Sequence, residues 1–163
     1  IGTGSGCIAI SLDKKLPDVD VEAWDISEEA LAIARKNNED LEAGVRFLQR
    51  DVLSDDWEKV PSFDVIVSNP PYIDETDEHL FQGDVRFEPR SALVAGENGL
   101  ADLRHLIEYA PLHLNDGGYL LLEHGWKQGE EVRSIFWQNH WQGVATIRDY
   151  GDNERVTLGY WKR

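Results

Sequence analysis

The residues best suited to chemistry are Asn69-Pro70-Pro71-Tyr72, which directly follow a short apolar run, residues 63–67. That run predicts a buried strand. Proline fixes its own φ and favours extended backbone in the residue before it, so the segment is predicted to be stiff. In open α/β sheets, ligands bind at the carboxyl edge where such a segment lies. An ordinary Asn-Pro turn gives the same pattern, so the rest of the chain must decide between the two.

A stiff segment of this composition suits the transfer of a methyl group to a planar nitrogen. An amide nitrogen is a poor nucleophile because its lone pair is delocalised into the carbonyl. The side-chain oxygen of Asn69 and the carbonyl of Pro70 would accept hydrogen bonds from its two N–H groups, and Tyr72 would pack on the flat amide. These contacts stabilise the positive charge that grows on nitrogen. Holding the nitrogen in line with the methyl group brings the two reactants close together, an effect worth about 7–11 kcal/mol. No strong general base is required.

A glycine-rich turn opens the chain, Gly2-Thr3-Gly4-Ser5-Gly6. Its glycines allow a tight turn and close approach of a ligand to the backbone. Asp25 ends the next predicted strand, 19 residues after Gly6, where a carboxylate can accept hydrogen bonds from ribose hydroxyls. The pair predicts a ribose-bearing cofactor, and NAD, FAD and S-adenosylmethionine all fit. The segment at Asn69 favours methyl transfer, because hydride transfer does not require acceptors that hold an amide group.

Strands and helices alternate in the first part of the chain, which predicts a parallel sheet covered on both faces. Strands are predicted over residues 19–24, 45–49, 63–67, 119–122, 143–148 and 156–161. Helices are predicted over residues 7–16, 100–114 and 128–139, and a further helix begins at the N-cap Ser27 and ends near Gly44. Residues 115–118 are predicted to form a turn and residues 74–98 a long loop. The short connection at residues 150–153 predicts an antiparallel hairpin of the last two strands.

Composition narrows the class of protein. The chain has 163 residues, 41% hydrophobic and 29% charged, and a net charge of −15. We expect one domain, residues 1–163, and the acidity disfavours direct nucleic-acid binding. The single cysteine, Cys7, suits a reducing cytoplasm, and no apolar run approaches a membrane span. The five histidines show no metal spacing, so we expect no metal.

The chain contains no methionine and opens on Ile1, inside the glycine-rich turn. We therefore expect it to be a fragment of a longer protein. The turn at Gly2 needs a strand before it, so we expect the first strand of the sheet to be largely missing.

The glycine turn GTGSG, the acidic residue after the second strand and NPPY after the fourth resemble the class I S-adenosylmethionine-dependent methyltransferases that act on nitrogen. Four longer stretches, NPPYIDETDEHL, GDVRFEPRSALVAG, LLLEHGW and RDYGDNERVTLG, resemble the HemK-type protein-(glutamine-N5) methyltransferases, which modify peptide chain release factors. This resemblance implies a Rossmann-like, mostly parallel sheet with an antiparallel C-terminal hairpin. It also implies an N-terminal helical domain for substrate docking, which we expect to be absent from residues 1–163.

The resemblance assigns roles to residues that match the family motifs. Cofactor binding falls to the glycine turn and to four further positions, with Asn69 touching both cofactor and substrate: Gly2, Thr3, Gly4, Ser5, Gly6, Asp25, Asp51, Val52 and Asn69. Asp25 would hold the ribose. Val52 stands where some relatives have an aromatic residue, so apolar packing against the adenine, rather than stacking, follows from it. The substrate glutamine amide would be held by Asn69, Pro70, Pro71 and Tyr72, of which Asn69, Pro70 and Tyr72 are catalytic.

Three other functions fit part of the pattern. An adenine-N6 nucleic-acid methyltransferase uses the same Asn-Pro-Pro-aromatic grip on a flipped base, but the net charge counts against it. A ribosomal-protein glutamine methyltransferase is closer, although GDVRFEP and GDNERVTL favour release factors. A Rossmann-type binding domain without activity would leave NPPY unexplained. We expect a monomer, with Glu88-Pro89-Arg90 and residues 152–155 forming an ion-paired framework around the site.

Overall fold

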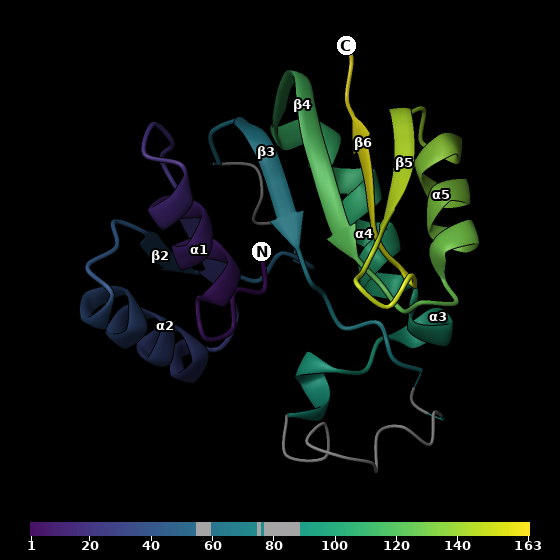
Figure 1. Ribbon diagram of the computed structural model, residues 1–163. Helices are drawn as coiled ribbons and strands as arrows, with labels where there is room; N and C mark the ends of the chain where they lie inside the picture. Colours follow the sequence, from purple (N-terminus) through teal and green to yellow (C-terminus); the bar gives the residue numbers. More distant parts are fainter. Residues whose placement is uncertain (55–59, 75, 77–88) are drawn as a thin grey trace. The chain divides into compact units, whose positions relative to one another are not determined.

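The computed structural model describes residues 1–54, 60–74, 76 and 89–163 (Figure 1). The chain divides into two compact units, Ile1–Lys59 and Val60–Arg163. Among the described residues, no helix combines the length and apolar character needed to cross a bilayer.

The first unit contains a parallel pair of strands, β1 (Glu22–Asp25) and β2 (Arg46–Gln49), and two helices, α1 (Cys7–Lys15) and α2 (Glu28–Asp40). A small core joins α1 to the strands, consisting of Ala9, Ile10, Ala23 and Val45. Helix α2 begins where the sequence predicts, because the hydroxyl of Ser27 accepts a hydrogen bond from the Ala30 backbone N–H at 3.2 Å. This cap satisfies one of the free donors at the helix start.

Two predictions for the first unit are wrong in detail. The strand predicted from Val19 begins only at Glu22. Gly44 does not cap α2: the helix ends at Asp40, and Glu42, with a φ of 50°, takes the left-handed conformation instead. The backbone N–H of Gly44 donates to Asp13 Oδ2 at 2.9 Å, which ties the loop after α2 to α1.

The second unit contains a four-stranded mixed sheet in the order β3-β4-β6-β5. Its strands are β3 (Phe63–Ser68), β4 (Leu114–Glu123), β5 (Gln142–Arg148) and β6 (Glu154–Tyr160). Strand β3 runs parallel to β4, whereas β6 is antiparallel to both β4 and β5. The predicted antiparallel hairpin is confirmed, and it places its β5–β6 turn at the same edge as the carboxyl ends of β3 and β4 (Figure 1).

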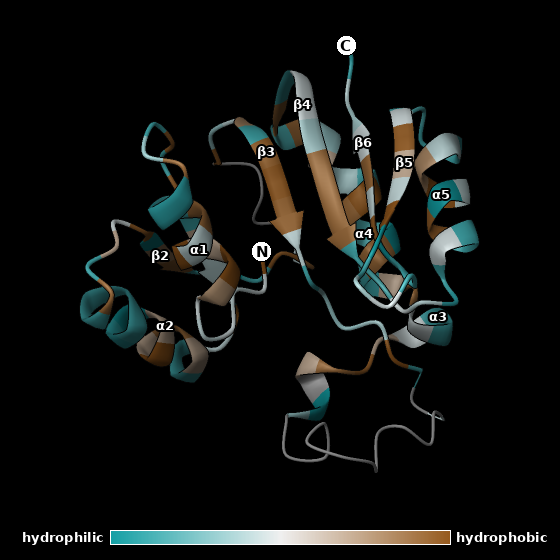
Figure 2. Ribbon diagram, in the orientation of Figure 1, coloured by the Kyte–Doolittle hydropathy of each residue, from teal (hydrophilic) through white to brown (hydrophobic). Residues whose placement is uncertain are grey.

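Helix α4 (Ala101–Tyr109) is extended by a 3-10 turn over Ala110–His113, which contacts β4. Helix α5 (Gly129–Gln138) packs against α4 and against strands β5 and β6. The helical spacing of Leu103, Leu106, Ile107 and Ala110 predicts that these residues share one face, and all four are buried. The indole N–H of Trp141 donates to the Ile107 carbonyl at 3.1 Å and links α4 to the start of β5. Figure 2 shows apolar residues along β3 and much of β4, and Ile66, Leu120 and Leu122 of these strands are buried.

The turn predicted at residues 115–118 is wrong, because β4 already begins at Leu114. The register with β3 shifts, so that Phe63 pairs with Leu114 but Val65 pairs with Tyr119. Gly117, with a φ of 81°, lies in this irregular stretch. Of the loop predicted over residues 74–98, the described part holds two short helical turns, Arg90–Ala92 and α3 (Gly96–Gly99); residues 75 and 77–88 lie outside the described residues.

Candidate active site

The glycine turn of the first unit leads into α1 and is tied to the carboxyl end of β1. The backbone N–H of Thr3 donates to the Trp24 carbonyl at 2.9 Å. Gly2 and Gly4 have φ values of 63° and 55°, and a Cβ at either position would meet no atom within 4 Å. The turn therefore needs glycine for its conformation and leaves open space beside its backbone. Gly6 differs, since a Cβ there would lie 3.2 Å from Ala34 Cβ on α2.

Asp25 anchors this turn. Its Oδ2 accepts a hydrogen bond from the Gly4 backbone N–H at 2.8 Å, and its Oδ1 accepts one from the Ser27 backbone N–H at 2.9 Å. A carboxylate has about four acceptor positions, so both oxygens retain capacity for a ligand hydroxyl. Asp25 thus fixes the turn and offers acceptors at the end of β1. From α2, the side-chain amide of Asn37 adds a further hydrogen bond to the Ser5 carbonyl at 2.9 Å.

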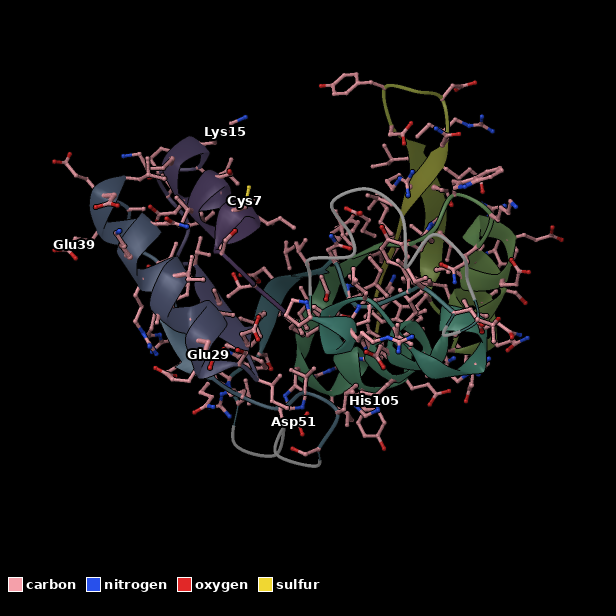
Figure 3. The ribbon with its side chains drawn as sticks, turned by 90° about the horizontal axis from the view of Figure 1, so that it is seen from below. Cys7, Lys15, Glu29, Glu39, Asp51 and His105 are labelled. Atoms are coloured by element: carbon pink, nitrogen blue, oxygen red, sulfur yellow. The ribbon has the colours of Figure 1, made fainter. Side chains whose placement is uncertain are left out.

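Asp51 and Val52 lie in the turn that follows β2, at the same strand edge as Asp25. The register pairs Asp25 with Gln49, and the Arg50 N–H donates to the Asp25 carbonyl at 3.0 Å. Asp51, labelled in Figure 3, closes its own turn by accepting from the Leu53 N–H at 3.0 Å. Val52 is half-buried. The first unit therefore gathers the glycine turn, Asp25, Asp51 and Val52 at one edge.

The segment from Asn69 to Tyr72 belongs to the second unit, where it leaves the carboxyl end of β3. Asn69 is exposed, Pro70 is buried, and Pro71 and Tyr72 are half-buried. On the N-terminal side, Ser68 is buried and pairs with Leu122 of β4. The segment therefore presents an accessible amide side chain from a firmly packed base.

The ring of Tyr72 is fixed by β4, because its hydroxyl donates to Glu123 Oε1 at 3.2 Å. Burial and the nearby Glu123 carboxylate raise the pKa of Tyr72, with Arg155 acting in the opposite direction. The phenol therefore stays protonated at neutral pH and remains a donor. This contact, between residues 51 positions apart, locates the aromatic ring beside the end of β4.

Charged residues near the β5–β6 turn are paired, as predicted for residues 152–155. Arg133 on α5 contacts Glu154 Oε2 at 2.8 Å, and Arg155 contacts Asp149 Oδ2 at 3.2 Å. The Arg133 side chain lowers the pKa of Glu154, and the Asn153 backbone N–H, followed by Arg155, lowers the pKa of Asp149. These pairs brace the hairpin. Glu88, assigned to the same framework, lies outside the described residues.

A buried histidine follows Glu123 on β4. His124 is fully buried, and its Nε2 lies 2.8 Å from the hydroxyl of Thr157 on β6. The Thr157 hydroxyl in turn lies 2.8 Å from that of Thr146, which accepts from Arg133 at 2.8 Å. Burial lowers the pKa of His124, so the ring is neutral in the folded protein at pH 7.

Acidification below about pH 6.5 is expected to destabilise the protein, because the unfolded chain then takes up a proton that His124 does not bind when folded. The His124→Asn variant should melt at a temperature that depends less on pH than that of the wild type. His113, whose pKa burial also lowers, contributes equally to both proteins. The matched control is His140→Asn, at an exposed position with a φ of 63°. Equal pH dependence of wild type and His124→Asn would contradict the prediction.

The predicted site residues thus form two groups. The predicted cofactor residues lie in Ile1–Lys59, except Asn69, which lies with the predicted substrate residues in Val60–Arg163. Sequence reasoning missed the residues that hold these groups in place. Glu123, which accepts from Tyr72, had a signal, its position in LLLEHGW. Asn37 and Gln128, whose side-chain amide donates to the Tyr72 carbonyl at 3.1 Å, had none, because their contacts join distant parts of the chain. Cys7 is exposed on α1 (Figure 3), and among the described residues no group of three or more His, Cys, Asp or Glu is arranged to hold a metal ion.

Comparison with known proteins gives relatives along the whole chain. A release factor glutamine methyltransferase of Haemophilus influenzae is 53% identical over 100% of this chain and 58% of that protein. One of Salmonella typhimurium is 54% identical over 98% of this chain and 57% of that protein. The chain therefore spans somewhat more than half the length of these relatives.

A methyltransferase from Pyrococcus furiosus shares the fold, with a TM-score of 0.75 and 23% identity over 100% of this chain and 73% of that chain. The family model for the methyltransferase small domain matches residues 1–85. That match covers the glycine turn, Asp25, Asp51 and the whole Asn69–Tyr72 segment. Since it extends over more than half of the residues, this chain belongs to the methyltransferase small domain family.

Proposed function

We propose that the protein transfers a methyl group from S-adenosylmethionine to the side-chain amide nitrogen (N5) of a glutamine in peptide chain release factors, and so modulates translation termination. Residues 1–163 act as its catalytic domain. The observation that carries this proposal is the identity of 53–54% along essentially the whole chain to proteins named release factor glutamine methyltransferase. The Asn69–Tyr72 segment supplies the matching chemistry.

The first unit fits S-adenosylmethionine. When bound, this cofactor supplies an electrophilic methyl group on a sulfonium. The open space beside Gly2 and Gly4 would admit the methionine and ribose portions against the backbone. Asp25 retains acceptor capacity for the ribose hydroxyls, while Asp51 and Val52 at the same edge would flank the adenine, with Val52 supplying an apolar surface.

The second unit fits a primary amide. The exposed Asn69 side-chain oxygen and the Pro70 carbonyl would accept hydrogen bonds from the two amide N–H groups, and the Tyr72 ring would lie on the amide plane. The nitrogen would bond to the methyl carbon that S-adenosylmethionine supplies, as the carbon–sulfur bond breaks and its electron pair stays on sulfur. The nitrogen releases its proton to water. Acceptors fixed in place before the amide arrives stabilise the charge that develops on nitrogen without reorganisation.

Intact-mass and peptide-mass analysis of a release factor incubated with the intact protein and S-adenosylmethionine tests this proposal. We expect a gain of one methylene group, located on a glutamine. A release factor in which that glutamine is replaced should gain nothing. Methyl transfer only to DNA, RNA or a ribosomal protein would contradict the proposed substrate.

The Tyr72→Phe variant is expected to lower kcat for the release factor by about tenfold, because it removes a hydrogen bond to a charged group, worth about 1.5–3 kcal/mol, and frees the ring from β4. Glu123→Gln retains an acceptor for the Tyr72 hydroxyl and should lose less. Steady-state kinetics measure both effects. The matched control is Tyr119→Phe, on β4 and 43% exposed; equal kcat values for the Tyr72 and Tyr119 variants would refute the role of the hydroxyl.

We also propose that the protein acts as a monomer in the cytoplasm and does not bind nucleic acid directly. The net charge of −15 supports the last point, because phosphate recognition requires clustered basic residues. Light scattering of the intact protein, alone and with a DNA or RNA oligonucleotide, measures both the oligomeric state and this interaction.

A further inference from the structure

Gln128, at the start of α5, uses both ends of its side-chain amide. Its Nε2 donates to the Tyr72 carbonyl at 3.1 Å and to the Asn98 carbonyl at 3.2 Å. Its Oε1 accepts from the Gly125 backbone N–H at 2.8 Å. One side chain therefore joins three loops: the segment after β3, the turn before α4 and the connection from β4 to α5.

The turn that contacts Gln128 is α3 (Gly96–Gly99), and it packs against the Tyr72 carbonyl. Glu97, Asn98 and Gly99 have consecutive φ values of 54°, 57° and 83°. This left-handed run is unfavourable for non-glycine residues. A Cβ on Gly99 would clash with the carbonyl oxygen of Tyr72 and lie 2.8 Å from Gln128 Nε2. The turn thus adopts a strained conformation where it touches Tyr72, and only glycine leaves room for the contact.

The residue after Tyr72 is fixed as well. The Ile73 N–H donates to the Leu93 carbonyl at 2.9 Å, and the Ala95 N–H donates to the Ile73 carbonyl at 3.1 Å. Together with the pairing of Ser68 and Leu122 in the sheet, these bonds hold the segment from Asn69 to Tyr72 at both ends. Gln128 holds the carbonyl of Tyr72, the last residue of this segment.

From these contacts we infer that Gln128 is a positioning residue for methyl transfer, holding the Tyr72 carbonyl in a socket formed with the Gly96–Gly99 turn. This inference rests on the proposed function of the Asn69–Tyr72 segment. With its carbonyl held, the Tyr72–Ile73 peptide cannot rotate, and the fixed φ angles of Pro70 and Pro71 limit the movement of the residues before it. Gln128 itself touches no reacting atom. It sets where the acceptors stand before the substrate amide binds.

The test uses two variants of Gln128 in the intact protein. Gln128→Glu exchanges only the amide nitrogen for oxygen, so it keeps an acceptor for the Gly125 N–H and places an oxygen against the Tyr72 and Asn98 carbonyls. Gln128→Met removes the donor without adding charge. The matched control is Gln138→Glu, at the exposed end of the same helix, where the amide donates to Ser134 at 3.3 Å.

Hydrogen exchange provides a measurement that does not depend on activity. In both Gln128 variants, the Ile73 and Ala95 amides should exchange about tenfold faster or more, because a partly buried carbonyl that loses its donor destabilises the local structure. The kcat for the release factor should fall about tenfold, while the KM for S-adenosylmethionine stays unchanged. Gln138→Glu should match the wild type in all three quantities.

Unchanged exchange at Ile73 and Ala95 in both variants would overturn the inference. Faster exchange with an unchanged kcat would also overturn it, because the socket would then have no part in positioning. A wild-type protein that does not methylate a release factor contradicts the proposed function instead, and the exchange rates still decide whether Gln128 holds Tyr72.

Discussion

Replacing Asn69 with alanine is expected to lower kcat for methyl transfer by about 10²–10³-fold, the loss seen when one preorganised group that stabilises transition-state charge is removed. Asn69 is exposed at the end of β3, while Ser68 before it and Pro70 after it are buried. The truncation therefore removes an accessible acceptor without opening a cavity. Folding should be little affected.

Steady-state kinetics with a release factor measure the loss, and calorimetric titration with S-adenosylmethionine should show that cofactor binding is largely intact. The matched control is Asn115→Ala. Asn115 is exposed in the same unit, but it donates to Asp64 at 2.8 Å near the start of β4. Wild-type turnover by Asn69→Ala would remove the residue from the mechanism, and with it the amide grip on which the proposed reaction depends.

Local rules predict much of this structure. Ser27 begins α2 because its hydroxyl caps the first turn, and the spacing of Leu103, Leu106 and Ile107 identifies the buried face of α4. The turn residues at 150–153 predict the β5–β6 hairpin. In each case the residues that decide the structure lie within a few positions of one another, so the sequence pattern contains the physical cause.

The wrong predictions arise where a contact from elsewhere overrides the local preference. Gly44 is the obvious residue to end α2, but its N–H is held by Asp13, and Glu42 takes the left-handed conformation. Residues 115–118 have a turn composition, yet β4 already begins at Leu114 and absorbs them in an irregular pairing with β3. Neither partner can be identified from the nearby sequence.

In the candidate site, too, residues governed by local sequence are predictable, whereas residues governed by distant contacts are not. The residues proposed to touch ligand, Asn69–Tyr72, the glycine turn and Asp25, are recognisable from composition and spacing. Gln128 is not, because its partner Tyr72 lies 56 positions away and its own neighbours in the sequence are typical of the ordinary start of a helix. Groups that bind are constrained by local chemistry, whereas groups that position them are constrained by the folded chain.

Replacing Asp25 with alanine is expected to weaken S-adenosylmethionine binding by about 100-fold, equivalent to about 3 kcal/mol. Three losses contribute, one of which is the hydrogen bond that Asp25 Oδ1 accepts from the Ser27 N–H at 2.9 Å. The variant also removes the carboxylate acceptors for the ribose hydroxyls, and it releases the Gly4 N–H, which Asp25 holds at 2.8 Å. The glycine turn would then lose the bond that fixes its shape, although the Thr3 and Asn37 contacts remain.

Calorimetric titration with S-adenosylmethionine measures the change, and two further variants separate its causes. Asp18→Ala, at an exposed position in the loop before β1, should bind as the wild type does. Asp25→Asn keeps one acceptor oxygen but turns its NH2 group toward the backbone N–H of either Gly4 or Ser27, so its affinity should fall between those of the wild type and Asp25→Ala. Unchanged affinity in Asp25→Ala would refute the ribose contact, because even the loss of the Gly4 anchor alone should weaken a site built on that turn.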